Sequence, residues 1–395
     1  VRDLTIVQEF AKNDQGKYYL SKSTLQADFS LLKSGGGPGM FGERTVAYSD
    51  YVINRVRPDS LYKGQPVVSE QDTAMHDDAF WQEARPDTLT SWEAETYVKI
   101  DSLKNMKSFR RTLDLMTMAI VGYKKASPYV EIGPVNTFYS FNPVEGQRIR
   151  VGARTTPTMS KRIYLESYAA YGLKDERWKY LFGTTWSFTG RSIFEFPVRS
   201  LKVYYQKDTR IPGQDLPFLQ EGNFLFSFTR GVNDKWLYND IWNAEYLHEF
   251  RNHFSYKIGL KNWRQSPAGG LQYFRYDGSG QVQVNDLTTS EALLELRWAP
   301  NELFYQGKAG RTQINTRYPI FTMRTRVGMK GVMNSEYDYQ AVALNVYKHV
   351  FAGQFGYSDV VLEGGYYFGR APFPLLVIHR ANQTYALQNM SFNMM

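Results

Sequence analysis

The sequence predicts an all-β protein with a short helical segment. We expect an antiparallel transmembrane β-barrel of about 11 or more visible strands, truncated, preceded by a small β piece and one or two amphipathic helices. From Pro128 onward, apolar and polar residues alternate with a period of two over roughly 270 residues. Several strands exceed the usual ~5–6 residues and match the ~9–11 that cross a bilayer at a tilt. Tyr, Trp and Phe gather near strand ends, as interfacial girdles require.

Residues 1–66 are predicted to form a β-rich piece ahead of the barrel. Residues 18–29 read as a strand, and the glycine-rich run 35–39 breaks it. Residues 37–42 match G-x-G-x-x-G, but a dinucleotide site needs a helix to begin there, and residues 45–49 read as extended. We therefore interpret the glycine-rich run as a loop.

Residues 67–127 are predicted to be a helical linker or a plug-like segment. Thr90 and Glu93 have the spacing of a capping box, and apolar residues from Trp92 to Ile120 can recur on one helical face. We expect one or two amphipathic helices between residues 90 and 124. They either fill or underlie the barrel lumen or pack against the β piece, and the sequence leaves both placements open.

Residues 128–395 are predicted to form the outer-membrane β-barrel, incomplete at its C-terminal end. The expected strands are 129–141, 146–156, 162–172, 178–188, 199–206, 241–251, 254–264, 290–299, 319–330, 339–349 and 354–368. The connection 300–318 is too long for its side of the barrel, so we expect a missed or misassigned strand there.

The charged residues of these strands are predicted to face the lumen, because a charge on the lipid face costs about 2–4 kcal/mol at the bilayer midplane. The predicted lumen-facing residues are Arg148, Arg150, Arg154, Glu166, Lys179, Lys202, Lys257, Lys261, Glu291, Glu295 and Arg297. The predicted lipid-facing and girdle residues are Trp178, Tyr180, Phe182, Trp186, Phe188 and Trp298. We expect a wet lumen with an excess of positive charge.

A soluble β-sandwich is the alternative, in which the same charged residues form ordinary solvated faces. Alternation alone does not separate the two folds. Strand length and aromatic density favour the barrel.

The composition leaves little material for catalysis or metal binding. The 395 residues contain no cysteine and five scattered histidines, and no catalytic, cofactor-binding or metal-binding constellation is found. The net charge of +8 is modest for this length and does not argue for nucleic acid. The longest apolar run, 116–121, is too short for a membrane helix. Because the chain starts at Val1 and its last residues lack a turn, we expect a fragment truncated at both ends.

Several stretches together resemble the DUF5686 family of Bacteroidota, whose members are often labelled carboxypeptidase-like regulatory domain-containing proteins. The stretches are Phe29–Lys33 with the glycines after it, Thr45–Val52, Phe141–Arg150, Glu295–Pro300 and Gly369–Thr384. The resemblance implies a bacterial outer-membrane barrel whose expected partners are outer-membrane lipid and other envelope proteins. In full-length members a small β-sandwich precedes the barrel, and here it would lie upstream of Val1. The label does not imply peptidase activity.

Residues 144–154 also resemble early barrel strands of the Omp85 superfamily, which inserts or translocates outer-membrane proteins. The loop motif Val-Arg-Gly-Phe/Tyr of that superfamily is absent, and the nearest string is Thr229–Val232. The expected function is therefore a non-enzymatic, cofactor-free role in outer-membrane protein assembly or transport. The alternative is a passive uptake or binding barrel for anionic solutes, drawn by a positive lumen.

Overall fold

The computed structural model describes residues 3–13, 16–30, 39–48, 51, 55–56, 58, 67–69, 79–80, 91–212, 234–278, 280–307, 310–314, 318–377, 381–382 and 392–393. The chain divides into two compact units, one of Val1–Gly64 with Glu70–Phe109 and one of Gln65–Ser69 with Arg110–Met395. These boundaries differ from the expected divisions after residues 66 and 127.

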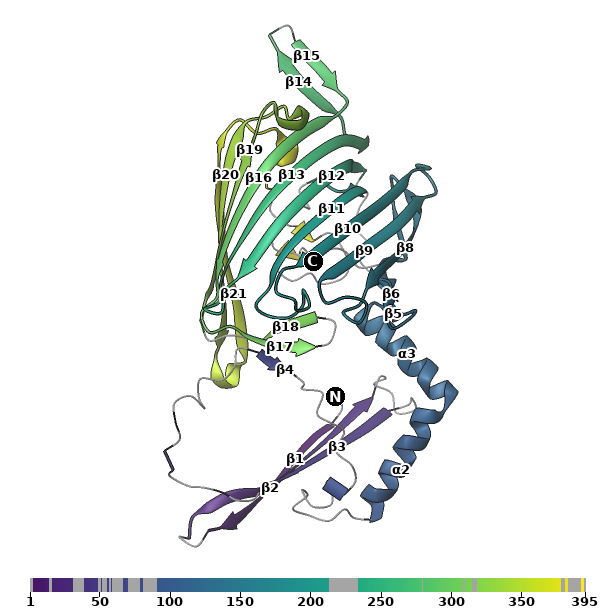
Figure 1. Cartoon of the computed structure of the whole chain (residues 1–395), viewed down its shortest axis with the longest axis vertical. Helices are drawn as coiled ribbons and strands as arrows, with labels where there is room; N and C mark the ends of the chain where they lie inside the picture. The colour runs from purple at the N-terminus through teal and green to yellow at the C-terminus, as the bar shows by residue number, and fades with distance from the viewer. Residues whose placement is uncertain are drawn as a thin grey trace. The chain divides into compact units, whose positions relative to one another are not determined.

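The N-terminal unit contains a three-stranded antiparallel sheet in the order β1-β2-β3, as the predicted β piece requires (Figure 1). Its strands are β1 (Asp3–Lys12), β2 (Tyr18–Ser30) and β3 (Gly39–Ala47). Since β3 begins at Gly39, a strand and not a helix follows the glycine-rich run. The sequence therefore lacks the helix that a dinucleotide site needs at this point.

Two helices form between residues 90 and 124, as expected. They are α2 (Ser91–Asn105) and α3 (Lys107–Val121). The amide of Met106, between them, donates to the carbonyl of Leu103 at 3.0 Å. The side chains of Trp92 and Leu113 on the expected apolar stripe are exposed. Thr90 and the Glu93 side chain lie outside the described residues, so the capping box stays a prediction.

The second unit is built on a large antiparallel sheet, which we call the main sheet (Figure 1). In the described residues its order is β21-β20-β19-β16-β13-β12-β11-β10-β9-β8-β6-β5, with β7 also paired to β8. Its strands are β5 (Lys124–Lys125), β6 (Val130–Ile132), β7 (Tyr139–Asn142), β8 (Gly146–Thr155), β9 (Ile163–Gly172), β10 (Trp178–Ser187), β11 (Arg199–Arg210), β12 (Lys235–Glu249), β13 (Phe254–Gly269), β16 (Leu287–Trp298), β19 (Ile320–Gly328), β20 (Tyr339–Phe351) and β21 (Tyr357–Gly369). The protein is therefore all-β and mostly antiparallel, as predicted.

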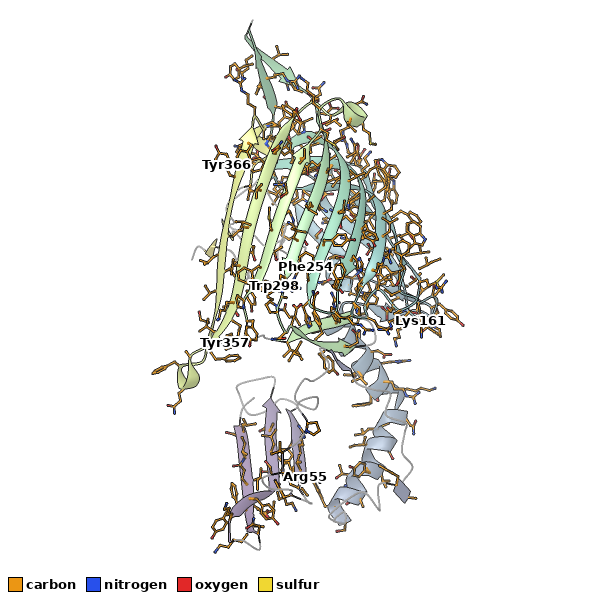
Figure 2. All side chains as sticks on the ribbon, turned by 60° about the vertical axis from the view of Figure 1, so that its left-hand side comes forward. Arg55, Lys161, Phe254, Trp298, Tyr357 and Tyr366 are labelled. Carbon is orange, nitrogen blue, oxygen red and sulfur yellow. The ribbon has the colours of Figure 1, made fainter. Side chains whose placement is uncertain are left out.

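The main sheet is curved but not closed within the described residues (Figure 1). No pairing there joins β21 at one edge to β5 at the other. Tyr357 and Tyr366 mark the two ends of edge strand β21 (Figure 2).

One strand assignment from the sequence is wrong, and several strands are longer than expected; β11 and β13 end at Arg210 and Gly269, after the expected residues 206 and 264. The expected strand 129–141 is interrupted by Pro134 and the 3₁₀ turn Val135–Thr137, which leaves the short strands β6 and β7. Proline ends the pairing because it has no backbone N–H to donate. Strand β12 starts at Lys235, earlier than the expected residue 241.

Three smaller sheets accompany the main sheet. Strands β14 (Tyr273–Asp277) and β15 (Gly280–Val284) form one hairpin. Strands β17 (Leu303–Gly307) and β18 (Gly310–Ile314) form a second one inside the long connection where a missed strand was expected. Strand β4 (Val67–Ser69) pairs in parallel with β17. The short strands β22 (Ala381–Asn382) and β23 (Phe392–Asn393) form the last pair.

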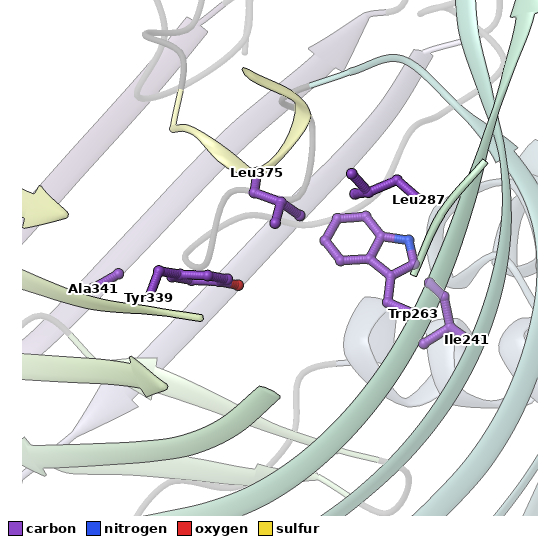
Figure 3. Packing of buried hydrophobic residues seen from close by; sticks show 6 residues of the cluster. All are labelled: Ile241, Trp263, Leu287, Tyr339, Ala341 and Leu375. Carbon is purple, nitrogen blue, oxygen red and sulfur yellow. The ribbon is translucent and has the colours of Figure 1, made fainter. Parts of the chain in front are cut away.

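A hydrophobic cluster lies where the chain folds back after β21. The 3₁₀ turn η6 (Phe373–Leu375) places the Leu375 side chain between Tyr339 on β20 and Trp263 and Leu287 on β13 and β16 (Figure 3). The Tyr367 hydroxyl donates to the Leu375 carbonyl at 2.6 Å. The segment 371–377 is thereby held against the strands of the main sheet.

Candidate functional site

The two faces of the main sheet carry different side chains. Residues directly opposite each other on paired antiparallel strands share a face. The register sets Arg154 opposite Glu166 and Lys261 opposite Glu291. We call the face with these residues the polar face, and the structure places every predicted lumen-facing residue on it. They are Arg148, Arg150, Arg154, Glu166, Lys179, Lys202, Lys257, Lys261, Glu291, Glu295 and Arg297.

The opposite face, which we call the apolar face, carries the residues predicted to meet lipid. Phe182 is opposite Tyr205, Trp186 is opposite Leu201, and Trp298 is opposite Phe254 and Phe321. Phe254 and Trp298 lie near the same end of their strands (Figure 2). The predicted set of Trp178, Tyr180, Phe182, Trp186, Phe188 and Trp298 is exposed throughout, from 37% for Trp186 to 61% for Phe182.

Burial on the main sheet is the reverse of that in a water-soluble sheet. On the polar face, Lys179 is 1% exposed, Glu291 is 4% exposed and Arg148 is 9% exposed. On the apolar face, Ile258 and Leu260 are more than half exposed. Charged side chains are almost never fully buried unless they are paired, and a large exposed apolar surface marks an interaction site. The apolar face is therefore a surface that requires an apolar neighbour.

The buried cations at the β8–β11 end are each paired with carboxylates. The Lys179 ammonium lies 2.9 Å from Glu145 Oε1 and 2.6 Å from Asp175 Oδ2. The guanidinium of Arg148 lies 2.8 Å from Asp208 Oδ1. A Cβ on Gly172 would lie 2.2 Å from Asp175 Oδ1 and 2.8 Å from Lys179 Nζ, so a larger residue at this position would have to displace this ion pair. Such pairing offsets the large cost of removing charges from water.

Further ion pairs continue around the polar face. Glu295 accepts a hydrogen bond from Arg324 Nε at 2.9 Å and lies 3.4 Å from Lys257 Nζ. The other pairs are Arg154 with Glu131 at 2.8 Å, Lys202 with Glu166 at 2.5 Å, and Arg297 with Glu302 at 2.8 and 2.5 Å. Cations of this face also lie over aromatic rings, as Arg150 does over Tyr168 and Lys261 over Trp263.

The sequence analysis predicted fewer acidic residues on the polar face than the structure places there. The predicted acids were Glu166, Glu291 and Glu295. Further carboxylates that pair with cations on this face are those of Glu131, Glu145, Asp175, Asp208 and Glu302. Strand alternation missed Glu145, Asp175 and Glu302 because they lie in turns, and Asp208 because β11 continues past its expected end at 206. The expected excess of positive charge is thus reduced by carboxylates that the prediction did not include.

Aromatic rings contact one another at several places on the apolar face. Near one end of β10, Phe188 contacts Tyr246 and His248 stacks on Phe250, with ring centroids 6.1 and 4.3 Å apart. Near the other end of β10, Tyr171 contacts Trp178 at 5.1 Å and Tyr180 contacts Tyr205 at 5.8 Å; Tyr205 also contacts Trp242, at the middle of β12, at 4.5 Å. Aliphatic side chains lie beside these rings, as Ile258 does opposite Tyr246 and Leu260 opposite Ala244.

In the part of the chain that the structure describes, no group of three or more His, Asp or Glu residues is arranged to hold a metal ion. Among the same residues, no helix has the length and hydropathy needed to cross a membrane. The string Thr229–Val232 lies outside the described residues.

The fold and its two faces define an antiparallel β-sheet protein with an enclosed polar face and an exposed apolar face. The chain matches the model for the C-terminal domain of DUF5686, described as a family of unknown function, over residues 114–393. The protein therefore belongs to the DUF5686 family. A search of curated proteins finds no match.

Proposed function

We propose that the main sheet is the wall of a transmembrane β-barrel in the bacterial outer membrane, with its apolar face against lipid and its polar face toward the interior. The reversed burial of the two faces carries this proposal. Exposed Phe182, Ile258 and Leu260 would be unfavourable in water but match acyl chains, while the paired charges stay in the interior.

The height of the apolar band supports a bilayer as the apolar neighbour. On the apolar face of β11, Arg199 and Lys207 are separated by Leu201, Val203 and Tyr205. At ~3.3 Å per residue, these two charges are about 26 Å apart along the strand. Because the strands of a transmembrane barrel tilt by ~35–45°, this length spans about 20 Å of height, which is close to the ~25 Å apolar band of such barrels.

Within the membrane we propose a non-enzymatic role in assembly or transport of outer-membrane components, as the resemblance to the Omp85 superfamily implies. In the described residues only β20 pairs with edge strand β21, so its other edge can hydrogen-bond to a further strand. The ion pairs on the polar face argue against the alternative of a passive pathway for anions, because Lys179, Lys202 and Arg148 are already paired with carboxylates.

Substitutions at neighbouring positions of β10 test the orientation of the sheet. Phe182→Arg places a charge on the apolar face, and Leu181→Arg places the same charge on the polar face, opposite Tyr168 and Gln206. We expect Phe182→Arg to destabilise the membrane-inserted protein by about 2–4 kcal/mol. Leu181→Arg should change it much less, because Asp208 lies beside Tyr168 and Gln206. Folding into lipid vesicles, followed by urea titration, measures both.

Equal losses for the two variants would reject the assignment of faces. A Phe182→Arg protein that stays soluble and folded without detergent would support the β-sandwich instead.

Depletion and conductance measurements separate the two roles. We expect loss of the protein to lower the amount of other barrel proteins in the outer membrane, with little anion conductance from the reconstituted protein. A clear anion-selective conductance without an assembly defect would favour the passive alternative.

A further inference from the structure

Exposed cations gather at one end of the main sheet. The turns 156–162, 188–198, 250–253 and 352–356 all lie at this end, which Lys161 and Tyr357 mark in Figure 2. We call it the Lys161 end. Its strand ends and turns expose a set of cations that we call the basic collar: Lys161, Arg162, Arg191, Arg199, Arg251 and Lys348.

The basic collar is not neutralised by carboxylates of the described residues. No ion pair there joins a collar cation to a carboxylate, and Arg199 donates from Nε to a neutral partner, the Tyr246 hydroxyl, at 2.7 Å. Glu195, in the turn 188–198, is half-buried. Other carboxylates of this end are paired with residues outside the collar: Glu249 with Arg311, Glu302 with Arg297 and Asp359 with His349. The collar therefore carries positive charge that calls for an anionic neighbour.

The opposite end of the main sheet carries charges of both signs. The turn 173–177 exposes Glu176 beside Lys174 and Arg177, and the turn 329–338 exposes Lys330 and Asp338. Two further arginines at that end are paired, Arg264 with Asp286 and Arg275 with Glu336. The excess of positive charge therefore belongs to the Lys161 end and is not a general property of the surface.

The basic collar borders the apolar face. Arg199 shares that face of β11 with Leu201, and Lys348 lies on the same face of β20. Exposed aromatic rings lie beside the collar: the Arg199 guanidinium is 5.9 Å from the ring centroid of Phe188, and Trp298 ends β16 at this end. Aromatic rings with cations next to them are typical of the level at which lipid headgroups begin.

We propose that the basic collar binds the headgroup phosphates of anionic phospholipids, in the leaflet that surrounds the Lys161 end. Guanidinium and ammonium groups donate charge-assisted hydrogen bonds to phosphate oxygens, and an anionic membrane surface attracts Lys and Arg. This inference rests on the proposed membrane insertion. It adds to that proposal the class of lipid and the end of the sheet at which the lipid is held.

Spin-labelled lipids measure which headgroups lie against the protein. The full chain is folded into phosphatidylcholine vesicles with a trace of spin-labelled phosphatidylglycerol or, in a parallel sample, of spin-labelled phosphatidylcholine. We expect phosphatidylglycerol to be favoured beside the protein by about twofold or more, and the preference to shrink in about 0.5 M salt, because ions screen exposed charges. Equal occupancy by the two lipids would overturn the proposal and leave an acidic protein as the neighbour of the collar.

Two triple variants locate the preference. The collar variant replaces three cations with glutamine: Arg191→Gln, Arg251→Gln and Lys348→Gln. The control makes the same change at three exposed cations of the opposite end: Lys174→Gln, Arg177→Gln and Lys330→Gln. We expect the collar variant to lose about half of the preference or more, and the control to keep most of it. A folded collar variant that keeps the full preference, or an equal loss in the control, would reject the collar.

Circular dichroism checks the fold of both variants, and Lys348→Gln alone gives a second measurement should the collar variant not fold. Alkaline extraction of the vesicles tests insertion separately. Protein that is extracted would reject the membrane wall itself. Protein that stays inserted without a preference for phosphatidylglycerol would reject the collar and leave the membrane wall standing.

Discussion

The N-terminal sheet and the main sheet share an alternating pattern but differ in burial, because Leu4 and Ile6 of the N-terminal sheet are exposed. In the N-terminal sheet, Leu4 and Ile6 pair with Ala27 and Leu25, and the polar residues on the other face, such as Glu43, are exposed too. In the main sheet the polar side chains are buried and ion-paired. Three strands cannot curve around one face, whereas many twisted strands can. Enclosure therefore depends on the number of strands and not on the alternation.

The largest expected difference in stability between the two sheets is for the substitution of a lysine. Lys179→Met would leave Glu145 and Asp175 buried without their cation, and we expect a loss of about 3–5 kcal/mol. In the N-terminal sheet, Lys22 is opposite Glu9 and its side chain reaches solvent. Lys22→Met should therefore lower the free energy of unfolding by only about 0–1 kcal/mol. Urea unfolding of each variant measures the difference. Similar small losses would mean that the polar face is more hydrated than its burial indicates.

Removing one carboxylate charge from each sheet should give the next largest difference. Glu295→Gln weakens contacts to both Lys257 and Arg324, and we expect a loss of about 1.5–3 kcal/mol. Glu43→Gln affects one exposed hydrogen bond from Gln26 and should change stability by less than about 0.5 kcal/mol. Thermal unfolding of the two proteins provides the comparison, and a larger effect at Glu43 would contradict it.

Replacing an isoleucine with serine should lower stability in lipid vesicles when the residue lies in the main sheet but not when it lies in the N-terminal sheet. Ile258→Ser would lower the stability of the vesicle-bound protein by about 2 kcal/mol, because Ile258 would lose its burial in acyl chains. Ile6→Ser should leave stability in vesicles nearly unchanged. Urea titration with and without vesicles gives the two values. A lipid-independent effect at Ile258 would argue against contact with acyl chains.

The smallest effect on stability is expected from the protonation of His253, in the turn between β12 and β13. Burial lowers the pKa of His253 below its usual 6.5, outweighing the opposite effect of Glu302. The neutral ring stacks on Phe196 with centroids 5.3 Å apart. Because the unfolded chain takes up the proton first, this contribution to stability is present above about pH 6.5 and is lost as the pH falls.

The control for this pH effect is His253→Asn, since asparagine tolerates the positive φ of 64° at this position. We expect the drop in melting temperature between pH 7 and pH 5 to be smaller in His253→Asn than in the unchanged protein. Equal drops would assign the pH dependence to other groups.

Much of the main sheet was predictable because alternation is a local property of the chain. Strands β8, β9, β10 and β20 fall close to their expected limits. Prediction failed where local chemistry broke the pattern, as at Pro134. The hairpin of β17 and β18 was expected only from the length of the 300–318 connection, because no alternation in that connection was assigned to a strand. The fold-back of Leu375 onto Trp263 also left no periodic signal, because it depends on contacts between distant residues.

Local alternation is enough to assign side chains to a face, because successive residues of a strand point to opposite sides. Which face is enclosed, and which carboxylates neutralise Lys179 and Arg148, depends on the folded sheet. Enclosure arises from the curvature of many paired strands. The ion pairs, in turn, join residues such as Glu145 and Asp175 that lie in turns and come together only when the strands pair.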